Sequence, residues 1–125
     1  MSSPADCRYL ESHEWHKLEG DVVTLGISQF AVEELTDITY VEALVQEGAV
    51  SKGDSVAEVE SVKATSEIYT GIDGEVIAVN QEVIDNPSLI NEDPFGKGWL
   101  LKIKVSDAGQ LDGLLSAADY DAQAG

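Results

Sequence analysis

A single lysine, Lys63, is the residue best suited to carry chemistry in this sequence. It lies in the stretch VESVKATSEIY, between two runs with the character of strands. A lysine amine has an ordinary pKa of about 10.4 and sits on a long, flexible chain, so on a tight turn it projects to where another enzyme can reach it. Lys63 is the only cation between Gly53 and Gly96, and the acidic residues of that stretch are Asp54, Glu58, Glu60, Glu67, Asp73, Glu75, Glu82, Asp85, Glu92 and Asp93.

The residues alone leave two interpretations of Lys63 open. In the first, the lysine is the attachment point of a cofactor, and the flanking strands hold its turn still. The uncharged Val62 and Ala64 would then leave room for a modifying enzyme, and Glu60 and Glu67 would mark the place for a partner. In the second, Lys63 is an ordinary surface lysine that offsets the surrounding negative charge.

The sequence contains none of the motifs of a self-sufficient active site. It has no GxGxxG, GxxxxGK[ST], GxSxG or HExxH pattern. His13 and His16 have a spacing that metal sites use on a helix, but no third His or Cys lies nearby. The acids of 85–93 do not match the spacing of a calcium loop. We therefore expect a protein that is not an enzyme, and a metal-dependent hydrolase using His13 and His16 is the alternative.

Size and charge restrict the classes of partner. The chain of 125 residues fits one domain over 1–125, and its net charge of −17 disfavours nucleic acid and anionic membranes while favouring basic docking surfaces. The N-terminus resembles neither a secretory signal nor an Arg-rich transit peptide, so we expect the chain to work where it is made or as a mature form. Cys7, the only cysteine, is expected to be an incidental thiol near a loose terminus.

Hydrophobic periodicity predicts a chain of short strands with a few helices. A short helix is predicted over 28–37 with Ser28 as its N-cap, and a C-terminal helical segment over 107–123 with a capping box at Ser116 and Asp119. A turn region is predicted over 47–54, a loop over 85–98, and strands over 21–27, 38–44, 55–61, 66–70, 75–80 and 99–105. This pattern favours a small barrel or sandwich with added helices.

Four separated blocks of the sequence resemble the glycine cleavage system H protein family. VESVKATSEIY resembles the lipoylation motif, SHEWHKLEGDVVTLGIS the N-terminal segment, GDSVAEVESVKA the carrier hairpin, and INEDPFGKGWLLKIK the late loop and strand. They cover most of residues 9–120 in the family's order. Lipoyl domains of 2-oxo acid dehydrogenases usually have Asp before the lysine, and biotin carriers usually flank it with methionines, so Val62 and Ala64 fit neither class as well.

The resemblance implies a mainly β, barrel-sandwich hybrid fold with short helices, in which the hairpin within 55–80 carries Lys63. It implies a lipoic acid joined to Lys63 as an amide, and a shuttle role for a carrier that is expected to be a monomer. The expected partners are a pyridoxal-phosphate glycine decarboxylase, a tetrahydrofolate-dependent aminomethyltransferase, dihydrolipoyl dehydrogenase and the lipoylating enzymes. Bacterial cytoplasm is the expected compartment, or the mitochondrial matrix for a mature eukaryotic form.

The resemblance also implies a cleft that protects the loaded arm. In the family the arm ends in a primary amine after it takes up the aminomethyl group, and the arm folds back onto the protein. Ser12, Glu14 and Glu67 match the motif positions that would line this cleft. A carboxylate that faces an ammonium in a partly dry cleft is stabilising.

The sequence departs from the family pattern at a few positions. Gln29-Phe30 stands where the family commonly has Asp-His, Ala43-Leu44 replaces Leu-Pro, and Gly71 replaces a proline after the hairpin. These changes leave two alternatives to a glycine cleavage carrier. One is a lipoyl carrier for lipoyl transfer or for another lipoyl-dependent complex, and the other is a non-lipoylated interaction module on the same fold.

Overall fold

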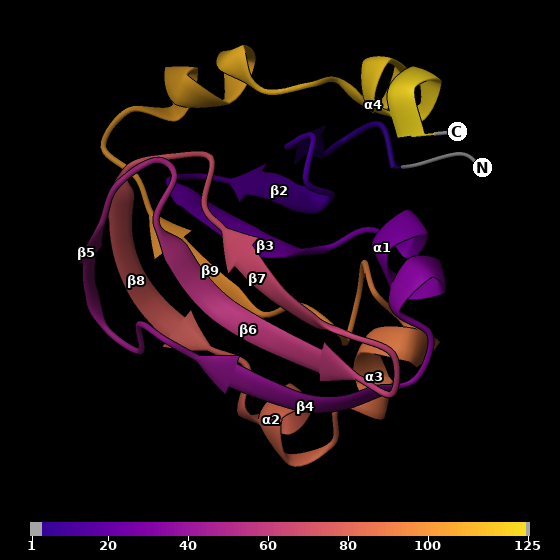
Figure 1. Ribbon diagram of the computed structural model, residues 1–125. Helices are drawn as coiled ribbons and strands as arrows, with labels where there is room; N and C mark the ends of the chain where they lie inside the picture. Colours follow the sequence, from indigo (N-terminus) through magenta and orange to yellow (C-terminus); the bar gives the residue numbers. More distant parts are fainter. Residues whose placement is uncertain (1–3, 125) are drawn as a thin grey trace.

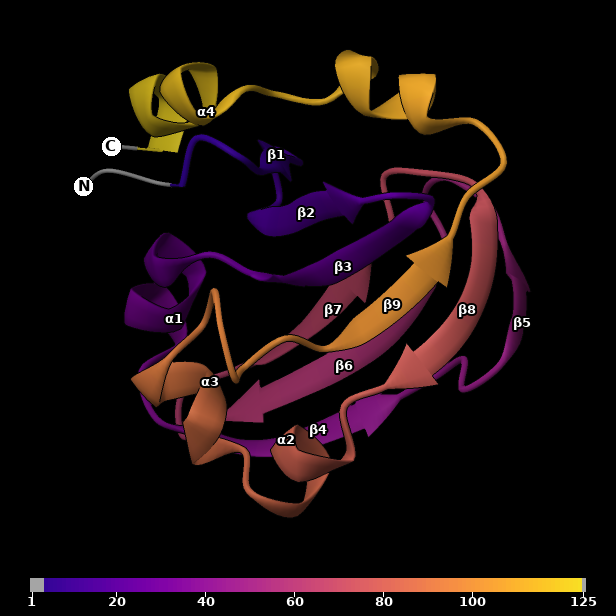
Figure 2. The same cartoon turned by 180° about the vertical axis from the view of Figure 1, so that it is seen from behind.

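Two antiparallel sheets make up the framework of the computed structural model, which describes residues 4–124 (Figure 1). The larger sheet has the order β1-β2-β3-β9-β8-β5, with bounds Arg8–Tyr9, Glu14–Glu19, Val22–Ile27, Leu101–Lys104, Gly74–Val79 and Gly48–Val50. The smaller sheet has the order β4-β6-β7, with bounds Ile38–Ala43, Ser55–Ser61 and Thr65–Tyr69. The mainly β class is therefore confirmed, with the two sheets packed over one another as seen from both sides (Figures 1 and 2).

The hydrophobic core lies between the two sheets, because alternate residues of the strands point inward. On β6, Ala57 and Val59 are buried while Glu58 and Glu60 are only half-buried, as the alternation of the sequence predicts. The core residues of the facing sheet include Val23, Leu25, Val76, Leu101 and Ile103. Burial of these branched side chains supplies the main driving force for closing the sandwich.

The helices cover the open ends of the sandwich. Helix α1, Gln29–Leu35, begins as predicted at Ser28, whose side chain accepts a hydrogen bond from the Ala31 amide at 3.4 Å. The prediction of a loop over 85–98 is wrong in part, because α2, Gln81–Asp85, and α3, Ser88–Glu92, enter this region. Proline is compatible with the start of a helix, and the fully buried Ile90 anchors α3 to the core.

The C-terminal helical segment predicted over 107–123 is present, but it is divided into two helices. A 3₁₀ helix, Ala108–Gly113, and α4, Ala117–Ala124, are separated by a short extended piece. Leu115 in this piece exchanges two backbone hydrogen bonds of 2.9 Å with Tyr9 of β1, and this pairing interrupts the helix. Ser116 does act as a cap, since its Oγ accepts from the Asp119 amide at 3.2 Å.

The N-terminal residues that the structure describes are packed against this C-terminal segment (Figures 1 and 2). Cys7 is buried beside Tyr9, Trp15 and Tyr120, so the expectation of a thiol near a loose terminus is wrong. Burial, followed by the charge of Asp6, raises the pKa of the Cys7 thiol to about 12, and the sulfur stays protonated at neutral pH. The sequence predicts no strand at β1 or β2, and it predicts a turn where the short strand β5 lies.

Candidate functional site

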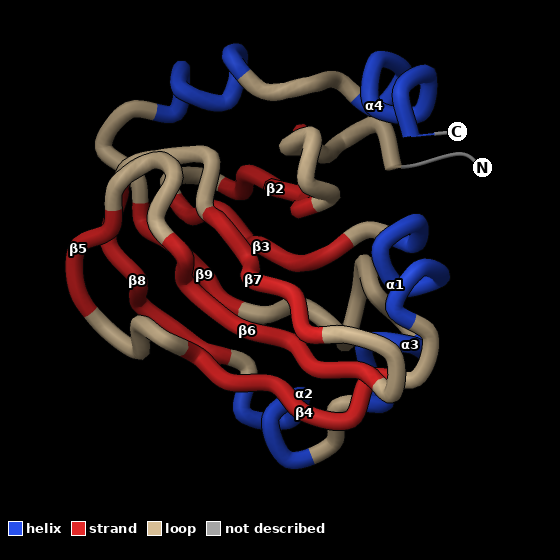
Figure 3. Tube along the Cα trace, viewed as in Figure 1, coloured by secondary structure: helices blue, strands red, loops and turns tan. Residues whose placement is uncertain are grey.

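The side chain of Ser61 organises the turn that carries Lys63. This turn joins β6 to β7 and is drawn as the tan loop between these two strands in Figure 3. The Ser61 amide donates to the Ala64 carbonyl at 2.8 Å, and the Ser61 hydroxyl donates to the same carbonyl at 3.1 Å. Ser61 Oγ also accepts from the amides of Lys63 and Ala64, at 3.1 and 3.0 Å. One serine therefore fixes the backbone on both sides of the lysine.

Lys63 itself is exposed at the tip of this hairpin. Within residues 4–124 its ammonium takes part in no ion pair, and Val62 beside it is 68% exposed. The Val62 amide donates to the carbonyl of Asp37 at 3.1 Å, which ties the hairpin to the segment between α1 and β4. The lysine thus extends from a fixed backbone into solvent, where a second protein can contact it.

A row of three glutamates crosses the sheet that carries the hairpin. Glu42 of β4 lies opposite Glu58 of β6, and Glu58 lies opposite Glu67 of β7. Like charges directly opposite one another destabilise a sheet, so this row costs stability in the isolated protein. It gives the face beside the Lys63 hairpin a negative field that attracts basic surfaces.

Glu14, at the start of β2, is completely buried and bridges the two sheets. One carboxylate oxygen accepts from the Ser12 hydroxyl at 2.5 Å, and the other accepts from the Tyr69 amide at the end of β7 at 2.6 Å. Burial is the main cause that raises the pKa of Glu14, and these two hydrogen bonds oppose the shift. Ser12 is exposed, so its hydroxyl connects the buried carboxylate to the surface.

Glu67 joins the same network through Tyr69. The Tyr69 hydroxyl donates to the exposed Glu67 carboxylate at 2.7 Å, and this hydrogen bond is the main cause that raises the pKa of Tyr69. Ser12, Glu14, Tyr69 and Glu67, here called the Glu14 cluster, form a continuous chain of hydrogen bonds. Ser12, Glu14 and Glu67 are the members predicted from the sequence. Tyr69 is not among them, although the two-residue period of β7 puts Tyr69 and Glu67 on one face.

His16 makes a second tie between β2 and the segment that follows β7. Its Nε2 accepts from the Gly71 amide at 3.0 Å, which places the imidazole proton on Nδ1. Burial lowers the pKa of His16 to about 4, so the ring is neutral at physiological pH. Gly71 replaces a proline of the family pattern, and a proline has no amide hydrogen to donate to His16.

His13 and His16, the two histidines of the hydrolase alternative, make separate contacts. His13 Nδ1 lies 2.7 Å from the Tyr120 hydroxyl, whereas His16 binds Gly71. Among the residues from 4 to 124, no three His, Cys, Asp or Glu side chains are grouped so that they could hold a metal ion.

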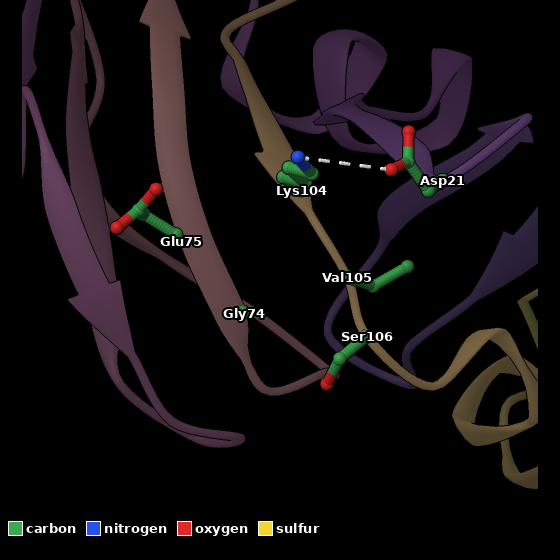
Figure 4. Close-up of a pocket in the computed structure, with 6 residues that line it drawn as sticks. All are labelled: Asp21, Gly74, Glu75, Lys104, Val105 and Ser106. Atoms are coloured by element: carbon green, nitrogen blue, oxygen red, sulfur yellow. Dashed lines mark ion pairs between the residues drawn. The ribbon is translucent and has the colours of Figure 1, made fainter.

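Two surface pockets lie outside the Glu14 cluster. The larger, of about 630 Å³, is lined by Asp21, Gly74, Glu75, Lys104, Val105 and Ser106 (Figure 4). Its one ion pair, Lys104 to Asp21 at 3.9 Å, is exposed and weak. The smaller, of about 170 Å³, lies over β2, β3 and β9, where the Lys102 ammonium is 5.1 Å from the centre of the Trp99 ring. Neither pocket includes Lys63 or a member of the Glu14 cluster.

No helix within the described part of the chain has the length and apolar character needed to cross a membrane.

The sequence matches the family described as "Glycine cleavage H-protein" over residues 7–124. A glycine cleavage system H protein of Thermosynechococcus vestitus is 52% identical over 122 residues, which are 98% of this chain and 94% of that protein. A probable glycine cleavage system H protein of Aeropyrum pernix is 50% identical over 92% of this chain and 80% of its own length. The crystal structure of a glycine cleavage system H protein from Mycobacterium marinum superposes with a TM-score of 0.87 at 35% identity, covering 97% of this chain and 98% of that one.

We predict that Ser61→Ala loosens the Lys63 turn. Loss of the hydroxyl leaves the Lys63 and Ala64 amides without their acceptor, so the free energy of unfolding should fall by about 1 kcal/mol and both amides should exchange with solvent faster. Urea unfolding and NMR hydrogen exchange measure the two effects. Ser51→Ala is the control, because the Ser51 side chain forms no hydrogen bond among residues 4–124. Equal exchange of Lys63 in both variants would contradict this role of Ser61.

We also predict that His16 makes the protein lose stability as the pH falls from 6.5 towards 4. The imidazole of the unfolded chain takes up a proton near pH 6.5, whereas the folded one does so only near pH 4. The unfolded state therefore binds more protons in this window. The contribution of His16 to the free energy of unfolding is fully present above pH 6.5 and has fallen by roughly 2 kcal/mol at pH 5.

Urea unfolding at about pH 7.5 and about pH 5 tests this against His16→Gln, whose side-chain oxygen can still accept from Gly71 but does not titrate. The native protein should lose more stability than the variant between the two pH values. Identical losses would show that His16 does not titrate differently in the two states.

Proposed function

Because this chain belongs to the glycine cleavage H-protein family, we propose that it is the lipoyl-bearing shuttle of a glycine cleavage system, with lipoic acid joined to Lys63 by an amide bond. The observation that carries the proposal is the placement of Lys63, an exposed lysine without an ion pair among residues 4–124, on a hairpin fixed by Ser61. When bound, the lipoyl group supplies the dithiolane that carries an aminomethyl unit derived from glycine and the electrons of the reaction.

The surroundings of Lys63 fit an attached group of this kind. An amide bond removes the charge of the lysine, and no carboxylate partner within residues 4–124 is left unpaired by that loss. Val62 and Ala64 are both exposed and uncharged, so a lipoylating enzyme can enclose the side chain from either side. Because the turn is already fixed, less conformational entropy is lost when a modifying enzyme binds it.

The Glu14 cluster suits the end of the loaded arm. Strand β7 begins beside the lysine turn at Thr65 and ends at Tyr69, roughly 13 Å further along, which an extended lysine side chain with its acyl group can cover. The amine at the end of a loaded arm is a cation at neutral pH. Ser12 and Glu67 are exposed acceptors for this cation, and Glu14 lies beneath Ser12.

Ser12 transmits the charge of Glu14 without exposing it. A hydroxyl that donates to a carboxylate becomes a stronger acceptor for a further donor. An ammonium that binds Ser12 Oγ therefore interacts with the Glu14 charge while Glu14 keeps its hydrogen bonds to Ser12 and Tyr69. This arrangement would hold the amine of the arm at Ser12 and Glu67, above the buried Glu14 carboxylate.

The partners included in the proposal are the pyridoxal-phosphate glycine decarboxylase, the tetrahydrofolate-dependent aminomethyltransferase, dihydrolipoyl dehydrogenase and the lipoylating enzymes. The row of Glu42, Glu58 and Glu67 supports docking of basic surfaces beside the hairpin, which would bring each partner to the same lysine. We also propose that the carrier is a monomer and that it works in the bacterial cytoplasm.

The mass of the intact protein from a host with an active lipoylating enzyme tests the attachment site. We predict a lipoyl-sized increment in the native protein that is absent from Lys63→Arg. Lys52→Arg is the matched control, because Lys52 is also an exposed lysine in a turn next to β6, and it should keep the increment. An increment that survives in Lys63→Arg would reject Lys63, and failure of the lipoylated protein to support glycine–bicarbonate exchange with the decarboxylase would reject the glycine cleavage role.

Glu14→Gln tests the part of the Glu14 cluster in holding the arm. The amide keeps an oxygen for the Tyr69 amide but lacks the negative charge, so the loaded protein, freed from its partners, should lose ammonia about tenfold faster. Ammonia release after loading by the decarboxylase is the measurement. Glu75→Gln, an exposed glutamate on β8, should leave the rate unchanged, and an unchanged rate in Glu14→Gln itself would reject the role.

A further inference from the structure

Tyr120 of α4 is inserted between the N-terminal strands and the start of α1. The residue is only 1% exposed, and its ring is stacked on Tyr9 of β1 with centroids 4.5 Å apart and planes within 10°. Helix α4 lies beside the β1–β2 segment in both ribbon views (Figures 1 and 2). A residue near the C-terminus therefore forms part of the packing around the β1–β2 turn.

The Tyr120 hydroxyl lies between two polar groups whose roles can be assigned. It is 2.5 Å from Ser28 Oγ and 2.7 Å from His13 Nδ1. Ser28 is fully buried and already accepts from the Ala31 amide, so its own hydrogen needs an acceptor, which the Tyr120 oxygen provides. The Tyr120 hydrogen is then directed to His13 Nδ1, and the His13 proton sits on Nε2.

His13 has a backbone conformation that needs support. Its φ of 83° is in the left-handed region, which costs energy for a residue other than glycine. The His13 amide donates to the Leu10 carbonyl at 3.0 Å, and the His13 carbonyl accepts from the Ser28 amide at 2.9 Å. The centroid of the His13 ring lies 4.6 Å from that of the Phe30 ring, so the side chain is held by Phe30 and Tyr120 together.

His13 stands in the chain between the two residues that begin the Glu14 cluster, Ser12 and Glu14. The backbone conformation of His13 therefore sets the position of the Ser12 hydroxyl relative to the Glu14 carboxylate, to which the hydroxyl donates a hydrogen bond of 2.5 Å. The pKa of Tyr120 is raised first by burial and further by the charges of Asp121, Glu14 and Glu34, so its hydroxyl remains a donor at neutral pH.

We propose that Tyr120 is a positioning residue for the loaded arm: its hydroxyl, through His13 and Ser28, holds the β1–β2 turn so that Ser12 faces the arm amine with the buried Glu14 carboxylate directly beneath it. The C-terminal helix is thus part of the machinery that retains the aminomethyl group, although it contributes no atom to the Glu14 cluster. This inference rests on the proposed role of the cluster and adds the residues that keep it in place.

Tyr120→Phe tests the inference because it removes the hydroxyl and keeps the ring that stacks on Tyr9. The loaded variant, freed from its partners, should release ammonia about fivefold faster than the native protein, the effect expected for loss of a hydrogen-bonded hydroxyl. Tyr40→Phe is the control, since Tyr40 is 47% exposed on β4 of the other sheet, and its rate should equal that of the native protein. A native rate in Tyr120→Phe would overturn the proposal.

A double-mutant cycle separates positioning from a general loss of packing. His13→Asn keeps a residue type that tolerates the left-handed region but removes the imidazole that Tyr120 contacts. It should also release ammonia faster, and the double variant with Tyr120→Phe should be no faster than the quicker single variant. If the two substitutions instead multiply their effects on the rate of ammonia release, Tyr120 does not act through His13 and the proposal is overturned.

Imidazole nitrogen NMR of the protein without its arm gives a readout that does not depend on loading. Nδ1 of His13 should show the shift of an acceptor in the native protein and lose it in Tyr120→Phe, with accompanying shifts of the Ser12 and Glu14 amides. Absence of these changes overturns the proposal even if Lys63 is lipoylated. If these shift changes occur but the decarboxylase never loads the native protein, the positioning role stands and the proposed function fails.

Discussion

The buried carboxylate of Glu14 is the interaction on which both the packing near the site and the proposed chemistry depend. A buried charge is costly unless hydrogen bonds compensate it, and here the Ser12 hydroxyl and the Tyr69 amide do so from two different parts of the fold. The Tyr69 bond joins the two sheets at this point. The same carboxylate makes the exposed Ser12 hydroxyl a stronger hydrogen-bond acceptor. One charge therefore takes part both in the packing of the fold and in the proposed arm site.

Strand β7 connects this charge to the lysine. Its first residue, Thr65, borders the exposed hairpin, and its last residue, Tyr69, binds Glu14 through the backbone and Glu67 through the side chain. Lys63 therefore extends into solvent at one end of a short strand, while the acceptors for a loaded arm are fixed at the other end. The rigidity of the turn and the length of the strand together determine where an attached arm can reach.

The sequence predicted those features that depend on neighbours along the chain. The alternation of β6, the Ser28 cap and the Lys63 turn are local patterns, and the structure contains each of them. Features that depend on distant partners were missed: Tyr9 pairs with Leu115, and that pairing divides the C-terminal helical segment. Three members of the Glu14 cluster came from the resemblance to a family, whereas the contact of Tyr120 with His13 has no signal in either segment alone.

The most direct test of this account is NMR of the lipoylated protein before and after the decarboxylase loads it. If the loaded arm returns to the Glu14 cluster, the amide signals of Tyr69 and Glu14 should shift on loading, while those of Thr24 and Lys102, on the outer face of the larger sheet, should stay in place. Shifts confined to the neighbours of Lys63 would show that the arm remains in solvent, and the account of the Glu14 cluster would then be wrong.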